Sequence, residues 1–322
     1  MQERTRASFG LQVQLSDNRD IPDSQRIGAR PSASGVPLNG HKRRTSCSVT
    51  GYHRKLEKTN AFIDPALLEL SDEINVGDFN YRFCSEFILD RSAGSTAKVL
   101  DYGCGSGRIV SFLRNQKIDA YGCDVFSQGG DYSSQVDPAL LSGNYVRRMN
   151  GDEIPFDNET FDFVVSNQVL EHVVDLDRVV SEMHRVLKPG GISVNLFPDK
   201  SVWREGHCHV MFLHWFPKQS RPRVYYAAAC AALGGGVHKA NKSPMQWSSD
   251  ICDWLDRWTH YRPYQSIADS FNTRFQRIEH LEDYWLLKRV EGCGPVAMLP
   301  ASVRRLIVRK FSGLVLTATR TV

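Results

Sequence analysis

One stretch of the sequence, Val99–Arg108, constrains the fold more than any other. It reads as a short apolar strand, a turn with three glycines and the start of a helix. Gly103, Gly105 and Gly107 tolerate positive φ and let the backbone approach a ligand without a Cβ clash. Free N–H groups at the start of the next helix would face that ligand. Asp101 comes where the strand ends, which is where ligands bind in open α/β sheets. The stretch therefore predicts a site for a nucleotide-like cofactor.

Strands and helices alternate along the rest of the chain. Strands are predicted at 99–102, 118–124, 145–149, 161–166, 192–197, 275–281 and 313–319. Helices are predicted at 66–70, 78–90, 108–116, 175–187, 224–233, 250–260, 264–271 and 300–311. A lysine, a proline and two glycines at 188–191 predict a sharp end to the helix before them. This alternation is typical of an α/β fold with a doubly wound parallel sheet.

Composition narrows the class of protein. The 322 residues are 41% hydrophobic and 24% charged, as in an ordinary globular protein, and the net charge of +4 does not require a nucleic-acid partner. The eight cysteines include no C-x-x-C pair, so reduced thiols are expected. No run approaches the ~18 apolar residues of a transmembrane helix, and the N-terminus has no apolar signal region. We expect a cytoplasmic protein.

Changes in amino-acid composition along the chain predict its domains. Residues 1–55 are rich in Ser, Arg, Gly, Asn and Asp without a sustained period, so we expect a disordered tail. A cofactor-binding core follows at 56–198. All six tryptophans lie after Pro198, and 199–262 is interpreted as an inserted helical cap on the substrate side. The range 263–322 then completes the core sheet.

The glycine spacing selects among cofactors. A dinucleotide fingerprint needs a third glycine at position 108, which is Arg108 here. A carboxylate at Asp101 would repel a pyrophosphate, whereas it suits a ligand with an ammonium group. S-adenosylmethionine carries an α-amino group and a sulfonium, and no phosphate. The charges therefore favour S-adenosylmethionine as the cofactor.

Five motifs occur in order and together carry a family resemblance. They are Val99–Arg108, Asp124, Gly151–Phe156, Phe161–Val173 and Glu182–Gly191. With them the chain resembles the class I S-adenosylmethionine-dependent methyltransferases, in particular the type-11 group that includes quinone C-methyltransferases. We expect a Rossmann-like sheet of seven strands, mostly parallel, with a helical cap insertion and an antiparallel last strand.

The resemblance implies roles for individual residues at the strand ends. Asp101 would orient the methionine ammonium, and Asp124 would accept hydrogen bonds from both ribose hydroxyls. The other cofactor contacts implied are the backbone of Gly103, Cys104 and Gly105, Val125 on the adenine face, Asp152 with Gly151 or Glu153 on the adenine amino edge, and Asn167 on the methionine side. Asn150 is the alternative to Asp152. Each of these could instead be an idle, solvated polar group at a strand end.

Histidines are the candidates for catalysis. His172 follows the fourth strand, but a histidine there is frequent in the resembled group, which suggests a supporting role. His207 and His214 lie in an aromatic-rich segment after the fifth strand, and either is preferred as the base that takes a proton from an oxygen acceptor. Glu205, Cys208 and His209 with these two histidines could hold a metal, but their spacing matches no recognised zinc pattern. We expect a metal-free pocket. These histidines could also simply satisfy buried backbone groups.

The functional prediction is methyl transfer to a small-molecule or lipid- or glycan-linked acceptor, with O-methylation assisted by a histidine base. An RNA or protein methyltransferase is the alternative, and a nicotinamide-dependent oxidoreductase is disfavoured by Arg108. No nucleic-acid partner is expected. The basic helix at 300–311 allows peripheral membrane contact through residues 303–311, although packing of its apolar face on the sheet is the commoner arrangement. The sequence does not predict an oligomeric state.

Overall fold

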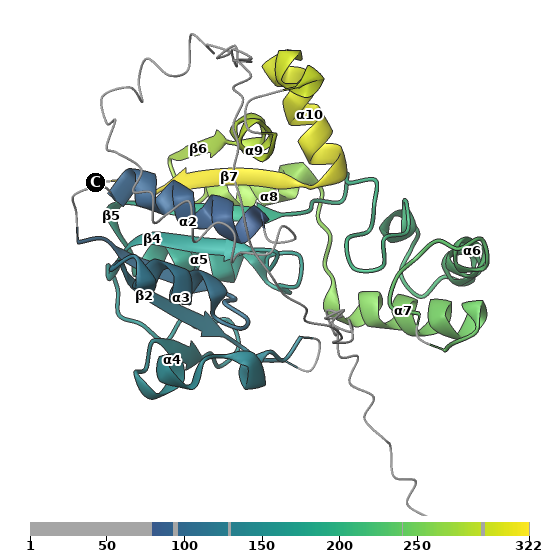
Figure 1. The fold of residues 1–322 in the computed structure, drawn as a ribbon, viewed down its shortest axis with the longest axis horizontal. Coiled ribbons are helices and arrows are strands. Elements are labelled where there is room, and N and C mark those ends of the chain that lie inside the picture. The colour runs from purple at the N-terminus through teal and green to yellow at the C-terminus, as the bar shows by residue number, and fades with distance from the viewer. Residues whose placement is uncertain (1–78, 93–95, 128–129, 240, 291–293, 322) are drawn as a thin grey trace, which may run out of the picture. The chain divides into compact units, whose positions relative to one another are not determined.

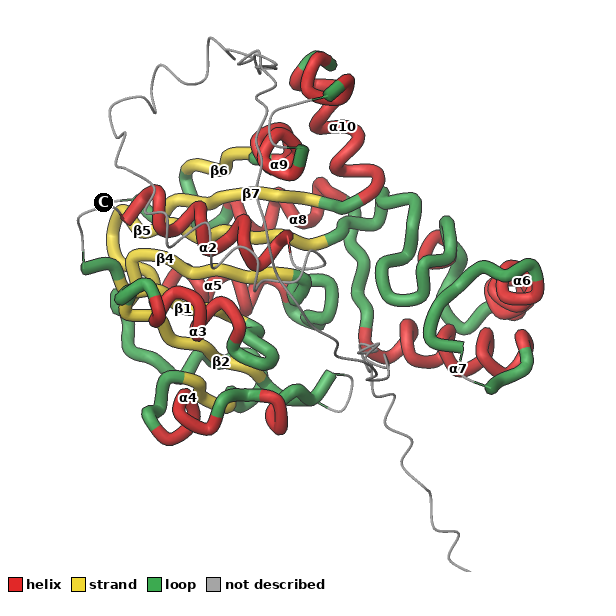
Figure 2. The backbone as a smooth tube through the Cα atoms, in the orientation of Figure 1, coloured by secondary structure: helices red, strands yellow, loops and turns green. Residues whose placement is uncertain are grey.

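The computed structural model describes residues 79–92, 96–127, 130–239, 241–290 and 294–321. Its centre is a seven-stranded sheet with the order β3-β2-β1-β4-β5-β7-β6 (Figures 1 and 2). The strands are β1 (Lys98–Tyr102), β2 (Asp119–Asp124), β3 (Val146–Arg148), β4 (Phe161–Asn167), β5 (Leu187–Phe197), β6 (Arg277–His280) and β7 (Leu314–Thr319). The predicted tail at 1–55 and the predicted helix at 66–70 lie outside the described residues.

One strand of the sheet, β7, runs opposite to the other six. Strands β1 to β5 run parallel to their neighbours, whereas β7 runs antiparallel to both β5 and β6. The central strands are apolar on both faces, because helices cover both: neighbouring Val99 and Leu100 of β1 point to opposite faces and are both fully buried. The predicted doubly wound, mostly parallel sheet with an antiparallel last strand is confirmed.

Helices form a layer on each face of the sheet (Figure 1). The helices of the described residues are α2 (Phe79–Ser92), α3 (Arg108–Asn115), α4 (Pro138–Ser142), α5 (Leu176–Val186), α6 (Arg221–Ala232), α7 (Pro244–Trp258), α8 (Tyr264–Asn272), α9 (Glu282–Arg289) and α10 (Ala301–Phe311). Phe83 of α2 and Trp285 of α9 share one buried cluster with Val99, and Phe271 of α8 shares the opposite cluster with Leu100. None of the helices in the described part of the chain is long and apolar enough to cross a membrane.

Helices α6 and α7 lie beyond the strands and have a core of their own (Figure 1). Trp247 and Leu255 of α7 are buried with Ala227 of α6 and with Cys208 and Leu213 from the segment before α6. This separate cluster lies within the predicted cap at 199–262. The domain boundaries themselves stay predictions.

Three details differ from the sequence-based expectation. Helix α5 ends at Val186, as the sequence at 188–191 predicted, but strand β5 begins at once at Leu187 and not at the predicted 192: Gly190 N–H donates to the Arg320 carbonyl, and Arg320 N–H donates to the Gly191 carbonyl. Helix α9 was not predicted from the sequence. Helix α10 packs on α9 and buries only Val308 fully, while Leu306 is 56% exposed. Its apolar residues are therefore only partly covered by the core.

Candidate cofactor and catalytic site

The glycine turn lies at the C-terminal end of β1. Gly103, Gly105 and Gly107 have φ of 73°, 51° and 78°, a region that side chains with a Cβ rarely occupy. A Cβ at Gly103 would also lie 2.4 Å from Cγ2 of Val169, which follows β4. The turn after β4 is thus packed directly against the glycine turn, and only glycine fits between them.

Asp101, two residues before this turn, is buried with 3% of its surface exposed. Burial, and secondarily the negative charge of Asp124, raises the pKa of Asp101 to about 8. A carboxylate in such a place gains most from a cationic partner, because an opposite charge restores its ionised form. An ammonium group of a ligand would be that partner.

Asp124 ends β2, the strand next to β1. Its two carboxylate oxygens accept hydrogen bonds from Gly105 N–H (2.9 Å) and Phe126 N–H (2.7 Å). Burial raises the pKa of Asp124, and these two N–H groups act against that rise. Each oxygen keeps a second lone pair for a ligand hydroxyl. Val125 beside it is 41% exposed, while Cys104 in the glycine turn is buried.

The predicted adenine-side residues form a tight turn after β3. Asn150 and Glu153 pair as an isolated bridge, and Gly151 between them has φ of 62° with no heavy atom within 4 Å of an added Cβ. The turn follows Met149, whose N–H donates to the Asp124 carbonyl (2.8 Å). Asp152 lies half-buried in the same turn. These contacts bring the turn to the end of β2 beside Asp124.

A salt bridge between Glu182 and Arg185 on α5 fixes the segment that follows this turn. Arg185 Nη2 lies 2.7 Å from Glu182 Oε2, and the guanidinium also donates to the carbonyls of Ile154 and Phe156. Glu182 accepts a hydrogen bond from Ile154 N–H (2.9 Å). The side chains of these two α5 residues therefore supply the backbone hydrogen bonds that a neighbouring strand would otherwise provide to this irregular segment.

Asn167 ends β4, and its Oδ1 is buried without a hydrogen-bond partner among the described residues. An unpaired buried carbonyl oxygen is costly unless a ligand supplies a donor. Asp101, Asp124 and Asn167 thus end three neighbouring strands at one edge of the sheet. Asp101 offers a carboxyl to an ammonium group, Asp124 offers a carboxylate to hydroxyl groups, and the three glycines of the turn let a ligand approach the backbone. These features fit S-adenosylmethionine.

The catalytic candidates meet in a second group, where the cap approaches the turn after β4. Glu205 is fully buried, and its Oε1 accepts hydrogen bonds from His207 Nδ1 (2.6 Å) and the Tyr261 hydroxyl (2.7 Å). Its Oε2 accepts the N–H groups of His207 (2.9 Å) and Cys208 (2.7 Å). Burial alone would raise the pKa of Glu205, but His207 and these other donors lower it to about 2. Glu205 is therefore ionised and holds the His207 ring in place.

His172 and His207, called here the imidazole pair, face each other through their Nε2 atoms at 3.3 Å. His172 Nδ1 lies 2.6 Å from the Trp258 carbonyl, so this nitrogen carries a proton. His207 Nδ1 likewise donates to ionised Glu205. If both rings were neutral, two Nε2 lone pairs would point at each other. A proton, a cation or the hydroxyl of a ligand between the two nitrogens would relieve this repulsion.

Glu171 is the residue of this group that sequence reasoning missed. It is 2% exposed, and neither carboxylate oxygen has a hydrogen-bond partner among the described residues. Burial raises the pKa of Glu171, with the charges of His172 and His207 acting against the rise. The only signal in the sequence was its place next to His172. Trp254 also borders the pair, with its ring 5.0 Å from that of His207.

The remaining histidines of the segment lie away from the imidazole pair. His214 packs on the ring of Tyr261 with the centroids 4.6 Å apart, and burial lowers its pKa. His209 is exposed, and Cys208 is buried with a raised pKa. The set considered for a metal from the sequence is thus not gathered at one point; the structure instead brings Glu171 and His172 to His207.

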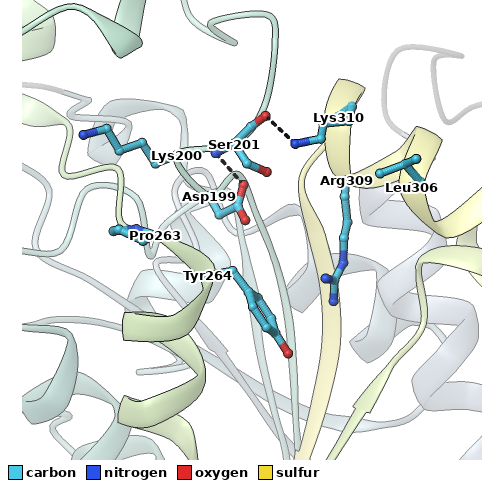
Figure 3. A pocket seen from close by; sticks show the side chains of 8 residues that line it. All are labelled: Asp199, Lys200, Ser201, Pro263, Tyr264, Leu306, Arg309 and Lys310. Atoms are coloured by element: carbon cyan, nitrogen blue, oxygen red, sulfur yellow. Dashed lines mark hydrogen bonds between the residues drawn. The ribbon is translucent and has the colours of Figure 1, made fainter.

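A separate hollow of about 400 Å³ lies beyond the end of β5 (Figure 3). Its lining residues are Asp199, Lys200, Ser201, Pro263, Tyr264, Leu306, Arg309 and Lys310. In Figure 3 Lys200 points away, while Lys310 donates to the Ser201 carbonyl (3.4 Å) and Arg309 lies over the Tyr264 ring. The hollow combines an apolar wall with cationic groups from α10.

The fold and the groups at the strand ends resemble those of the class I S-adenosylmethionine-dependent methyltransferases. Residues 100–195 match the family model described as methyltransferase domain. The matched range begins in β1 and ends in β5, so it contains Asp101, Asp124 and Asn167 but not the cap.

Known proteins resemble this chain over part of their length. It is 35% identical over 101 residues to the mitochondrial ubiquinone biosynthesis O-methyltransferase of Bos taurus, covering 30% of this chain and 27% of that protein. It is 29% identical over 174 residues to the mitochondrial arginine-hydroxylase NDUFAF5 of Mus musculus, covering 51% and 46%. An S-adenosylmethionine-dependent methyltransferase structure from Mesorhizobium loti aligns with 16% identity and a TM-score of 0.43, covering 76% and 100%. The chain thus spans less than half of these two curated relatives.

Proposed function

We propose that this protein transfers a methyl group from S-adenosylmethionine to an oxygen of a small-molecule or lipid- or glycan-linked acceptor. The observation that carries the proposal is the buried Asp101 carboxyl beside the glycine turn, since a carboxyl with a pKa of about 8 favours a cationic ligand there. Asp124 and Asn167 at the neighbouring strand ends supply acceptors for the rest of the cofactor. One relative is named as an O-methyltransferase, which supports the reaction class.

Methyl transfer from a sulfonium is an in-line displacement, so the protein mainly has to hold the acceptor in line. An oxygen acceptor must also lose its proton, and His207 is the better placed of the two preferred histidines. Ionised Glu205 fixes its Nδ1–H, which leaves Nε2 as the atom that takes the proton. His214 instead packs behind Tyr261. His172 supports the pair through the Trp258 carbonyl.

A protein acceptor is the second candidate, because one relative is named an arginine-hydroxylase and arginine is also a residue of proteins. Tritiated S-adenosylmethionine offered with catechols, sugar or lipid-linked acceptors, and with RNA or protein substrates, separates these candidates. Label in the small-molecule fraction is expected. Label only in RNA or protein would overturn the acceptor class, and label in none would contradict methyl transfer to all of them. A cytoplasmic location stays a prediction.

The raised pKa of Asp101 makes cofactor binding depend on pH. The free protein protonates Asp101 below pH 8, whereas the bound ammonium needs the carboxylate. Affinity for S-adenosylhomocysteine should therefore fall by roughly tenfold per pH unit as the pH drops from 7.5 to 6. The ligand's own α-amino group stays charged in this window, since its pKa is about 8.

Calorimetry at several pH values measures this dependence. Asp101→Asn should bind weakly and with a flat profile, while Asp119→Asn, at the exposed start of β2, should keep the wild-type slope. A wild-type affinity that does not change between pH 7.5 and 6 would show that Asp101 is not the partner of the ammonium.

We propose further that α10 contacts an anionic lipid surface when the acceptor is lipid-linked. Val303, Leu306 and Phe311 are 38%, 56% and 52% exposed on this basic helix, beside the hollow of Figure 3. Leu306→Glu should reduce co-sedimentation with phosphatidylglycerol-containing vesicles by roughly tenfold, the loss expected for one buried leucine. Leu233→Glu, which changes an 89% exposed leucine on the cap, is the control. Equal binding by both variants, or none by the wild type, would contradict the contact.

A further inference from the structure

The group around the imidazole pair has the composition of a metal site. One carboxylate oxygen of Glu171 and the free ring nitrogens of His172 and His207 all lie within 4.8 Å of one another. The residues come from two separate parts of the chain: Glu171 and His172 from the turn after β4, and His207 from the segment before α6. We propose that these three side chains bind one divalent transition-metal ion, with Zn²⁺ as the best-matched ion.

The distance between the two Nε2 atoms matches a shared ion. Two ligands at about 2.1 Å from a tetrahedral ion are roughly 3.4 Å apart, and the observed separation is 3.3 Å. The same separation between two neutral imidazoles would be repulsive, because each Nδ1 is already the protonated nitrogen. A cation in this position uses both lone pairs at once.

Both imidazoles are oriented as metal ligands usually are. His172 donates its other N–H to the Trp258 carbonyl (2.6 Å), and His207 donates its own to the Glu205 carboxylate (2.6 Å). Such outer partners fix the tautomer and raise the basicity of the ligand nitrogen. Glu205, which the sequence suggested as a ligand, is thus a positioning residue.

Glu171 supplies an independent observation. A buried carboxylate without any hydrogen-bond partner among the described residues is expensive unless a cation pairs with it. A side-chain rotation brings its oxygen the remaining distance to the ion. The backbone around it is held firmly: its carbonyl accepts His260 N–H (2.6 Å), and Arg262 donates to the Val173 carbonyl (2.6 Å). Two nitrogens and one carboxylate leave a coordination position open, as in catalytic zinc sites.

This site goes beyond the proposed function and replaces the expectation of a metal-free pocket with a different proposal. The ion would replace the proton shared by the imidazole pair. An acceptor hydroxyl in the open position would then have a lower pKa and release its proton to a solvent water, as zinc-bound water does. Only this consequence rests on the proposed methyl transfer.

Metal binding can be measured without cofactor or acceptor. Full-length protein stripped with a chelator should bind one equivalent of Zn²⁺ per chain in calorimetry. Co²⁺ in its place should give the intense visible absorption of a low-coordinate site. Glu171→Gln and His207→Gln should each lower the Zn²⁺ affinity at least tenfold and weaken the cobalt band. His209→Gln, an exposed histidine of the same segment, should bind as the wild type.

Three results would overturn the site: no stoichiometric binding by the wild type, octahedral cobalt spectra, or equal loss in His209→Gln. Unchanged affinity in Glu171→Gln would also remove the carboxylate from the ligand set. Should a variant unfold, which circular dichroism detects, the wild-type stoichiometry and cobalt spectrum still decide. Failure of methyl transfer would leave these readings unaffected, so the two proposals fail separately.

Discussion

Replacing Asp124 with alanine should weaken S-adenosylhomocysteine binding by at least roughly 100-fold. The variant would lose the two charge-assisted hydrogen bonds expected between the Asp124 carboxylate and the ribose, each worth about 1.5–3 kcal/mol. The carboxylate also accepts Gly105 N–H and Phe126 N–H, so the variant loses the contact that fixes the glycine turn beside β2. Calorimetry at pH 7.5 gives the affinity, and thermal unfolding shows that the variant is folded.

Asp119→Ala is the matched control for this change. It removes an aspartate from the other end of the same strand, where the side chain is exposed and pairs only loosely with Arg114 (3.4 Å). The affinity of this variant for S-adenosylhomocysteine should stay within threefold of the wild-type affinity, because an exposed ion pair contributes little. If folded Asp124→Ala binds as tightly as Asp119→Ala, the cofactor assignment is wrong.

His207→Gln should lower the turnover number by roughly 10²–10⁴-fold, the usual contribution of a positioned proton acceptor. The cofactor affinity should change little, since His207 is held by Glu205 in the cap-side group and not by the strand ends that bind the cofactor. The loss is expected whether Nε2 takes the proton itself or holds an ion that activates the acceptor. Turnover with saturating S-adenosylmethionine measures it once an acceptor is identified.

Two further variants test whether the loss of turnover is specific to His207. His214→Gln should keep most of the turnover, because His214 packs against Tyr261 and not against the imidazole pair. Glu205→Gln should lose turnover along with His207→Gln, because ionised Glu205 fixes the Nδ1 proton of His207. A His207→Gln enzyme with wild-type turnover, or a His214→Gln enzyme without any, would reverse the choice between the two histidines.

Much of the core could be predicted from local sequence. Val99, Leu100 and Tyr102 are large apolar residues that favour a buried strand, and the glycines after them favour a turn. The periodic helices at α3 and α5 were found to within a residue or two, because a strong apolar stripe leaves few alternatives. The short helix α9 lacks such a stripe, which explains why it was missed.

The segment 188–191 shows the limit of local rules. Its proline and glycines end the preceding helix as predicted, but they were not predicted to be strand, and the chain pairs there with Arg320, directly after β7. That partner lies more than 120 residues further along the chain, so no window of sequence contains it. Tertiary pairing overrode a local turn preference.

The sequence by itself determined the sheet and the cofactor class, because the strand, the glycine turn and Asp101 are contiguous and their chemistry is local. Only the tertiary structure decided which polar groups meet on the acceptor side. Glu171 and His172 follow β4, His207 lies 35 positions after His172, and Tyr261 comes from the far end of the cap. Their proximity depends on how the cap packs on the turn after β4, and that packing comes from long-range contacts that no spacing encodes.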